Sequence, residues 1–280
     1  MPIPNWAQFL LLAAALAASL WWLLRRRIVG SRSLPDKSRR DVAGIPAPIW
    51  LVCACVVFLA TALALVQAGA LPESILGPRG SVRAKALAEL IGYLAGVGAA
   101  CLALYLLSPR TSPATGLRLR WSDLPIALGA LLLLAPFYLL TVLLSQSVAS
   151  LLGHPPRTID HETLSFLKQH SADHWVWIRM AVIVLLVPIV EEMVYRVFLG
   201  SSLLAAIGKP WPALLITAAI FAIVHAVGGG PVSWVAVPGL FVLGVGLGVA
   251  FEHTRRLGVP IVMHALFNAA NIAAAIWLVD

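Results

Sequence analysis

The chain has 280 residues, of which 60% are hydrophobic and only 11% are charged. Soluble globular proteins carry about 25% charged residues, so this chain has too little charge to cover a water-facing surface. The composition excludes a soluble enzyme, a disordered chain and a coiled coil, and it leaves a polytopic helical membrane protein. The net charge of +8 then reflects membrane topology rather than nucleic-acid binding.

Apolar stretches of the length that a spanning helix needs, about 20 residues, follow one another along the chain. They cover residues 6–24, 46–71, 86–107, 124–152, 175–206, 211–227, 232–254 and 259–279. We therefore predict an all-α transmembrane bundle with about eight spans. Basic residues follow the first stretch and none precedes it, which is the reverse of a signal peptide and predicts an anchor that stays.

The basic residues between the stretches predict the orientation of the chain. Loops on one side carry 14 Lys and Arg residues, and loops on the other side carry five. Because cytoplasmic loops are enriched in basic residues, the richer side is predicted to face the cytoplasm, with both termini outside. We expect an integral protein of a bacterial inner membrane.

Two groups of potential metal ligands have a simpler interpretation. Cys53, Cys55 and Cys101 lie inside apolar stretches, where they serve as small apolar side chains. The loop 153–174 holds four histidines, but no Glu follows His170 to give the helix pattern of zinc proteases. We interpret this segment as a polar loop at the membrane surface.

Glycine pairs four residues apart occur in two of the stretches. They are Gly92-x-x-x-Gly96 and Gly244-x-x-x-Gly248. Small residues on one face let two helix backbones approach closely, so each pair predicts a tight contact with a neighbouring helix.

Ionisable side chains inside spanning helices cost at least about 2.5–3.5 kcal/mol each on insertion scales, so each one needs a reason. The first, second and fourth stretches contain none, and Glu89 in the third lies near enough to its start to reach the interface. The fifth, sixth and eighth stretches differ, because polar side chains lie in their interiors. These are Glu191, Glu192, Arg196, His225, His264, Asn268 and Asn271.

Helical spacing separates the two neighbouring glutamates. Residues four apart share a helix face, so Arg196 can neutralise Glu192. Glu191 lies about 100° around the helix and has the neutral Tyr195 four residues on. A carboxylate without a counter-charge suits a general base. Pro188 lacks a backbone N–H and can bend this helix.

Depth along the helices tests whether these residues can meet. At about 1.5 Å per residue, Glu191 and His225 lie about 24 and 22 Å from the turn at 208–210, so they can meet across two antiparallel helices. His264 fits less well, since it lies only about 9 Å from Gly258. Either a helix is strongly tilted or broken, or the fifth and sixth stretches are not simple spans.

The residue types indicate a hydrolytic site. A carboxylate with histidines can activate water, directly or through a metal. His264 and Asn268, on one helical face, can donate hydrogen bonds to a developing oxyanion. The patterns Gly-x-Ser-x-Gly and His-Glu-x-x-His are both missing from the sequence, which disfavours a serine nucleophile and the usual zinc-protease helix.

Three motifs, in this order, resemble those of the CPBP intramembrane proteases, which include type II CAAX prenyl endopeptidases and abortive-infection-like proteins. Glu191-Glu192-Met-Val-Tyr-Arg196 resembles Glu-Glu-x-x-x-Arg, Phe221-Ala-Ile-Val-His225 resembles Phe-x-x-x-His, and His264-Ala-Leu-Phe-Asn268 resembles His-x-x-x-Asn. The resemblance covers about residues 175–275. It divides the chain into N-terminal helices and loops, 1–174, and a catalytic helical core, 175–280.

The resemblance implies an intramembrane endopeptidase. Glu191 would be the general base, and His225 would hold the attacking water. His264 and Asn268 would form the oxyanion site.

The resemblance also implies supporting groups and leaves the cofactor open. Glu192 and Arg196 would position the helix that carries the base. The reaction would use either metal-free water or a divalent metal such as zinc. The ligands of such a metal would be Glu191, His225 and His264.

Two other functions stay open. A non-catalytic member of the same fold could act as a membrane scaffold or immunity factor, and a transporter could use intramembrane ionisable groups to carry protons. No repeat relates the two halves of the sequence, which disfavours the transporter. The predicted partners of a peptidase are the lipid bilayer and a peptide or membrane-protein substrate, prenylated or not, and no nucleic acid.

Overall fold

The computed structural model describes residues 5–30, 33–34, 42, 44–108, 116–117, 119–153, 162–227 and 234–277. These segments fold into helices joined by short connections and contain no strand. The prediction of an all-α bundle is therefore confirmed.

Long apolar helices account for most of the predicted spans. The N-terminal half contains α1 (Asn5–Arg25), α2 (Ala47–Gly69), α3 (Glu73–Leu76), α4 (Val82–Leu107) and α5 (Asp123–Leu151). The C-terminal half contains α6 (Glu162–Gln169), α7 (Trp175–Ala181), α8 (Val187–Glu192), α9 (Gly200–Ile207), α10 (Pro210–Ala226), α11 (Val237–Thr254) and α12 (Gly258–Trp277). Within the described residues, six helices are long and apolar enough to cross a membrane, namely α1, α2, α4, α5, α11 with its preceding turn, and α12. Helix α10 is apolar but shorter.

The fifth predicted stretch is not one regular α-helix. Two π-helical segments, Val182–Leu186 and Met193–Leu199, separate α7, α8 and α9. Pro188 lies at the start of α8, directly after the first of them, where the sequence predicted a disturbed helix. Short π-helical segments often occur at functional sites, and these two flank the paired glutamates.

Two predicted loops contain helices of their own. Helix α3 lies between the second and third predicted stretches, and α6 lies within the loop predicted at 153–174. His154 and His161 of the second loop lie outside the described residues.

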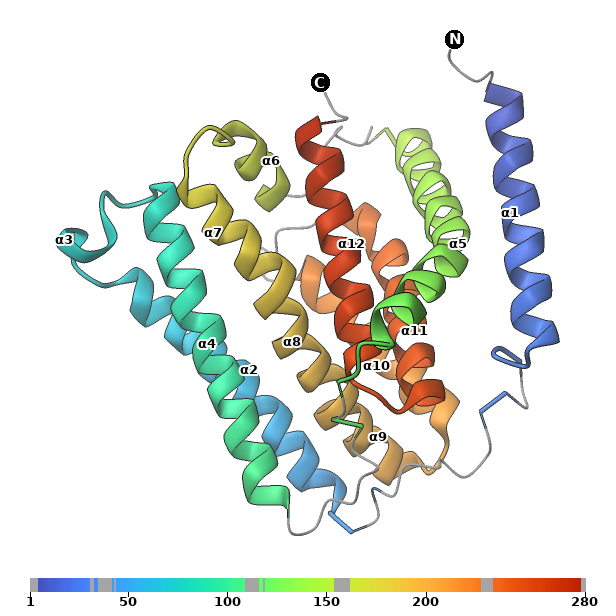
Figure 1. Cartoon of the computed structure of the whole chain (residues 1–280), viewed down its shortest axis with the longest axis horizontal. Helices are drawn as coiled ribbons and strands as arrows, with labels where there is room; N and C mark the ends of the chain where they lie inside the picture. The colour runs from blue at the N-terminus through green and yellow to red at the C-terminus, as the bar shows by residue number, and fades with distance from the viewer. Residues whose placement is uncertain are drawn as a thin grey trace.

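The helices pack around α8 and α12. Helix α2 packs against α4, α10 packs against α11, and α12 contacts α5, α6, α8 and the π-helical segment before α8. Helix α1 lies at the edge of the bundle beside α5 (Figure 1), and only 6% of its spanning window is buried. The start of α1 and the end of α12 lie at the same end of the bundle (Figure 1).

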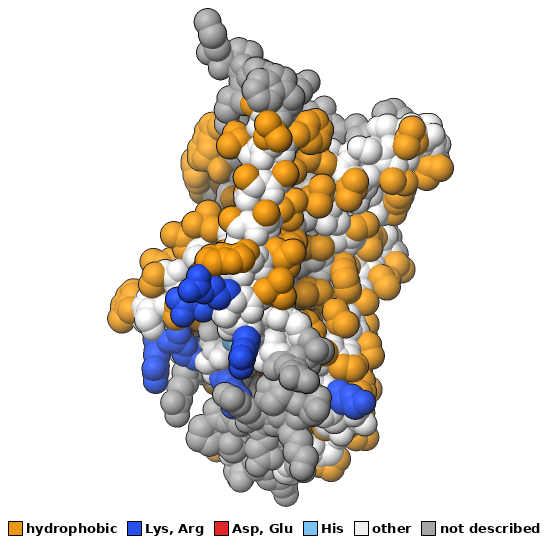
Figure 2. All heavy atoms as spheres, turned by 90° about the vertical axis from the view of Figure 1, so that its right-hand side faces the viewer, with side chains coloured by type: hydrophobic (Ala, Val, Ile, Leu, Met, Phe, Trp, Pro, Cys, Tyr) orange, Lys and Arg blue, Asp and Glu red, His pale blue; other side chains and the backbone are white. Residues whose placement is uncertain are grey.

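The outer surface is that of a membrane protein. Large apolar side chains of α1, α2, α4 and α5 are exposed along the length of each helix. Figure 2 shows this on one face, where hydrophobic side chains cover most of the surface and Lys and Arg side chains gather in its lower part. An apolar belt of this extent needs lipid around it, so the protein is an integral membrane protein.

Both predicted glycine contacts are present. A Cβ at Gly96 on α4 would collide with Thr61 Oγ1 on α2 and lie 3.2 Å from Val190 Cγ2 on α8. A Cβ at Gly244 on α11 would lie 3.1 Å from the Cβ of Ala218 on α10. The missing side chains therefore permit the close approach of these helix pairs.

Replacing Gly96 by leucine should destabilise the protein by about 1–3 kcal/mol, because the new side chain has no space between α2, α4 and α8. The matched control is Gly98→Leu on the same helix, where a Cβ would meet nothing within 4 Å. Thermal unfolding in detergent measures both. Equal unfolding midpoints for the two variants would show that Gly96 is not at a tight contact.

Candidate active site

Polar residues from all three C-terminal motifs line one cavity of about 710 Å³. Most of its lining is apolar, and it includes side chains from α2, α4, α5, α6, α8, α10, α11 and α12. Five of the sequence-predicted residues contribute to the lining: Glu191, His225, His264, Asn268 and Asn271. The N-terminal helices, in which no motif was found, therefore also shape the site.

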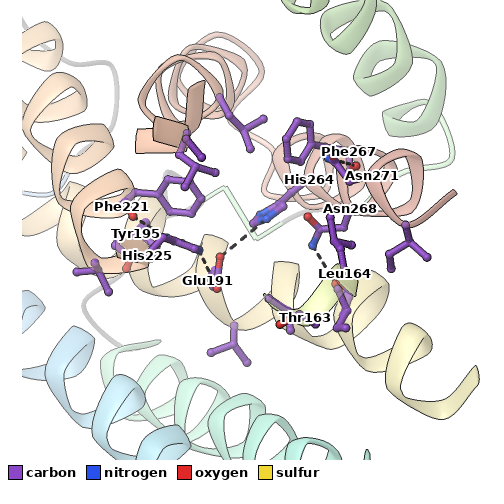
Figure 3. A pocket seen from close by; sticks show the side chains of 18 of the residues that line it. Thr163, Leu164, Glu191, Tyr195, Phe221, His225, His264, Phe267, Asn268 and Asn271 are labelled. Carbon is purple, nitrogen blue, oxygen red and sulfur yellow. Dashed lines mark hydrogen bonds and ion pairs between the residues drawn. The ribbon is translucent and has the colours of Figure 1, made fainter. Parts of the chain in front are cut away.

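Glu191 lies between two histidines from different helices. His225 Nε2 is 3.8 Å from Glu191 Oε1, and His264 Nε2 is 3.9 Å from Glu191 Oε2 (Figure 3). The Glu191 carboxylate is largely buried, and its Oε2 atom has no hydrogen-bond partner among the described residues. The predicted meeting of Glu191 with His225 is confirmed, and His264 joins them.

The orientation of His225 is fixed by its own helix. Its Nδ1 lies 2.7 Å from the carbonyl oxygen of Phe221, one turn earlier in α10. A carbonyl oxygen can only accept, so Nδ1 carries a proton and donates it. In the neutral ring, Nε2 then presents a lone pair towards Glu191.

The orientation of His264 is fixed by the second glutamate. His264 Nδ1 lies 3.0 Å from Glu192 Oε1, and both residues are buried. Nδ1–H therefore donates to the Glu192 carboxylate, which sets the tautomer of the ring and directs Nε2 to Glu191. The sequence predicted only an ion pair for Glu192, because its contact with His264 joins residues 72 positions apart.

The tilt of the helices explains how His264 can meet the two glutamates although its predicted depth differs from theirs. Figure 1 shows α7, α8 and α9 running obliquely past the more upright α12. Distance measured along the fifth stretch therefore overestimates its depth across the bundle. This helix is tilted and interrupted by π-helical segments, so Glu192 comes level with the first turns of α12.

Arg196 completes a buried charge network. Its Nε donates to Glu192 Oε2 at 2.8 Å, as the spacing predicted, and the side chain of Glu192 is fully buried. One carboxylate thus holds Arg196 with one oxygen and His264 with the other. A buried carboxylate needs such partners, because an unpaired charge in this environment is very costly.

The ring of Phe221 connects the two histidine helices. It is 1% exposed and lies 4.6 Å from the ring of His225 and 5.9 Å, edge to face, from the ring of His264. Tyr195 packs edge to face on the same ring at 5.2 Å. The Phe221 side chain therefore acts as a rigid spacer between the two imidazoles.

The two asparagines of α12 make different contacts. Asn268 Nδ2 donates to the carbonyl oxygen of Ile183 at 2.9 Å, across to the helix that carries Glu191. Asn271 Nδ2 donates to the carbonyl oxygen of Phe267 in its own helix at 2.8 Å. Both side chains line the cavity, but the amide nitrogen of Asn268 already has a backbone partner.

A second ion pair near the cavity was missed in the sequence. Arg179 donates to both carboxylate oxygens of Glu89, at 2.7–3.0 Å, and the Arg179 side chain is 7% exposed. Glu89, which was expected to reach the membrane interface, instead lines the cavity and joins α4 to α7. No spacing rule could pair residues 90 positions apart.

The side chains around Glu191 include potential metal ligands. Two imidazoles and a carboxylate are chemically suitable ligands for zinc. Across the described segments, however, no group of three or more His, Cys, Asp or Glu side chains has an arrangement that could hold a metal ion. Glu191, His225 and His264 as placed here therefore do not fit the metal site that the resemblance left open.

Comparison with known proteins finds a match for the motif-bearing segment. Residues 173–270 match a family model described as type II CAAX prenyl endopeptidase Rce1-like. No curated protein and no solved structure matches the chain. The matched segment contains all three motifs and all the residues that bind one another around Glu191. Over residues 173–270, this membrane protein is therefore similar to the family of Rce1-like type II CAAX prenyl endopeptidases.

Proposed function

We propose that the protein is an intramembrane endopeptidase in which Glu191 activates water to hydrolyse a peptide bond. The observation that carries this proposal is the position of the Glu191 carboxylate, between the Nε2 atoms of His225 and His264 in a mostly apolar cavity. Both separations are too long for a direct hydrogen bond and suit a small bridging molecule. A water molecule held there would lie against the base.

The proposed reaction has two proton transfers. Glu191 takes one proton from the water as the water oxygen attacks the carbonyl carbon of the substrate, while the remaining O–H donates a hydrogen bond to His225 Nε2. The resulting tetrahedral oxyanion collapses, and the C–N bond breaks. The protonated Glu191 then gives its proton to the leaving amine.

The oxyanion needs a hydrogen-bond donor, and His264 is suitably placed to be that donor. Glu191, Glu192 and Arg196 together leave one negative charge in excess, which a proton on one imidazole would neutralise. His264 Nδ1–H already donates to the Glu192 carboxylate, so a second proton on this ring would lie on Nε2, which faces Glu191. Its Nε2–H could then donate to the oxyanion, with the second N–H of Asn268 as the further donor that the resemblance implies.

The substrate is proposed from the cavity and the family. The cavity lies among membrane-spanning helices and has a mainly apolar lining, which suits a peptide or membrane-protein segment with apolar side chains. A prenylated CAAX peptide belongs to this class of substrate. We further propose a bacterial inner membrane, with both termini outside, from the excess of basic residues on the opposite side.

Replacing His225 by glutamine should abolish substrate cleavage in cells, because the amide lacks the imidazole ring that the bond to the Phe221 carbonyl oxygen holds in place with Nε2 towards Glu191. The measurement is mapping of new protein termini in membranes from cells that express the wild type or the variant. The matched control is His174→Gln, an exposed histidine whose side chain is 81% accessible. Termini present with the wild type and the control but missing with His225→Gln support the peptidase, and identical termini in all three favour a scaffold.

A further inference from the structure

The helix that carries the base has an interrupted hydrogen-bond ladder. The N–H of Val187 donates five residues back, to the carbonyl oxygen of Val182, as a π-helix requires. The next donor in the same register would serve the carbonyl of Ile183, but that position is Pro188, which has no N–H. The π register and the proline together leave the Ile183 carbonyl without its helical donor.

A side chain from another helix supplies the missing donor. Asn268 Nδ2 donates to Ile183 O at 2.9 Å, and both residues are half-buried beside the cavity. A buried carbonyl without a partner costs about 1–3 kcal/mol, so this bond has a clear thermodynamic reason. Figure 3 shows the Asn268 side chain turned towards the base helix.

The bond also fixes the site geometrically. Asn268 lies one turn after His264 in α12, and Ile183 lies two turns before Glu191. The contact of His264 with Glu192 joins the same two helices on the other side of Glu191. Helix α12 is therefore tied to the base helix both before and after the reacting carboxylate.

We propose that Asn268 is a positioning residue whose amide replaces the backbone donor that Pro188 lacks, so that the two residues act as one unit that holds Glu191 towards His264. The inference rests on the proposed peptidase function for its catalytic consequence, and on the hydrogen bond alone for its structural one. It explains how the helix accommodates a residue without a backbone N–H at position 188, and it gives Asn268 a role distinct from oxyanion binding.

A double-mutant cycle tests the unit. Pro188→Ala introduces an N–H that can serve the Ile183 carbonyl, and Asn268→Leu removes the amide with little change in volume. In the wild-type background, Asn268→Leu should lower kcat about 10–100-fold with little change in KM, because a displacement of about 1 Å at a catalytic group can cost about 100-fold. In the Pro188→Ala background, the same substitution should cost several-fold less in kcat and less in the unfolding midpoint.

The matched control is Asn271→Leu, an asparagine of the same helix that lines the same cavity but bonds only its own helix. Its effect should be the same with either residue at position 188. An equal loss from Asn268→Leu in both backgrounds, in kcat and in midpoint, overturns the proposal. If the wild type cleaves no peptide, the proposed function fails instead. The unfolding midpoints then test the structural part alone. A smaller loss from Asn268→Leu in the Pro188→Ala background supports the Asn268–Pro188 unit, and an equal loss in both backgrounds overturns it.

Discussion

Replacing Glu191 by glutamine should lower kcat for peptide cleavage by about 10²–10⁴-fold, the usual contribution of general-base catalysis. Glutamine keeps the size of the side chain and can still donate or accept a hydrogen bond, but it cannot take a proton from water. Because the nearest imidazole nitrogens lie 3.8 and 3.9 Å from the Glu191 carboxylate, beyond hydrogen-bond distance, the fold should depend little on its charge. Single-turnover cleavage by protein reconstituted in lipid vesicles, with thermal unfolding measured in parallel, checks both expectations.

The matched control for this substitution is Glu73→Gln on α3. Glu73 is also a glutamate in this chain, but its side chain is 60% exposed and is not part of the cavity lining. Cleavage should be unchanged in this variant. Retention of wild-type cleavage by Glu191→Gln, with the protein folded, would remove Glu191 from the mechanism and leave the non-catalytic alternative.

Replacing Arg196 by methionine should destabilise the protein by about 3–5 kcal/mol, the usual cost of removing one partner from a buried ion pair. The Glu192 carboxylate would stay fully buried and keep its hydrogen bond from His264, and the imidazole would be drawn away from Glu191. Activity should fall together with stability. Unfolding by heat or denaturant in detergent measures the loss.

Two further variants distinguish the effect of an unpaired buried charge on stability from the effect of losing any arginine. Arg79→Met removes an arginine that is 90% exposed and faces Glu73 at 3.9 Å, so it should change stability by no more than about 1 kcal/mol. Adding Glu192→Gln to Arg196→Met removes the unpaired charge and should restore part of the stability, but not the activity. A loss for Arg196→Met no larger than that for Arg79→Met would contradict the assigned network.

The match to the family covers residues 173–270, and the N-terminal helices lie outside it. Yet side chains of α2, α4 and α5 line the same cavity as Glu191, among them Thr61, Tyr93 and Tyr138. These helices therefore contribute to the walls against which a substrate would lie. Differences in substrate choice within such a family can arise there without any change in the reacting groups.

The sequence by itself determined the all-α membrane fold and most of the site. Long apolar stretches with few charges permit only membrane helices, because backbone groups in lipid must be satisfied within the helix. The pairing of Glu192 with Arg196 follows from a spacing of four residues, and the meeting of Glu191 with His225 follows from their similar distances to the turn at 208–210. These are consequences of helix rise and periodicity, which are local properties.

Only the tertiary structure decided how the third helix completes the site. The bonds of His264 to Glu192 and of Asn268 to Ile183, and the ion pair of Glu89 with Arg179, join residues 72 to 90 positions apart. Each depends on the tilt of α7–α9 against its neighbours and on the π-helical segments that turn side chains to new directions. Crossing angles result from packing between helices, so no periodicity within a single helix encodes them.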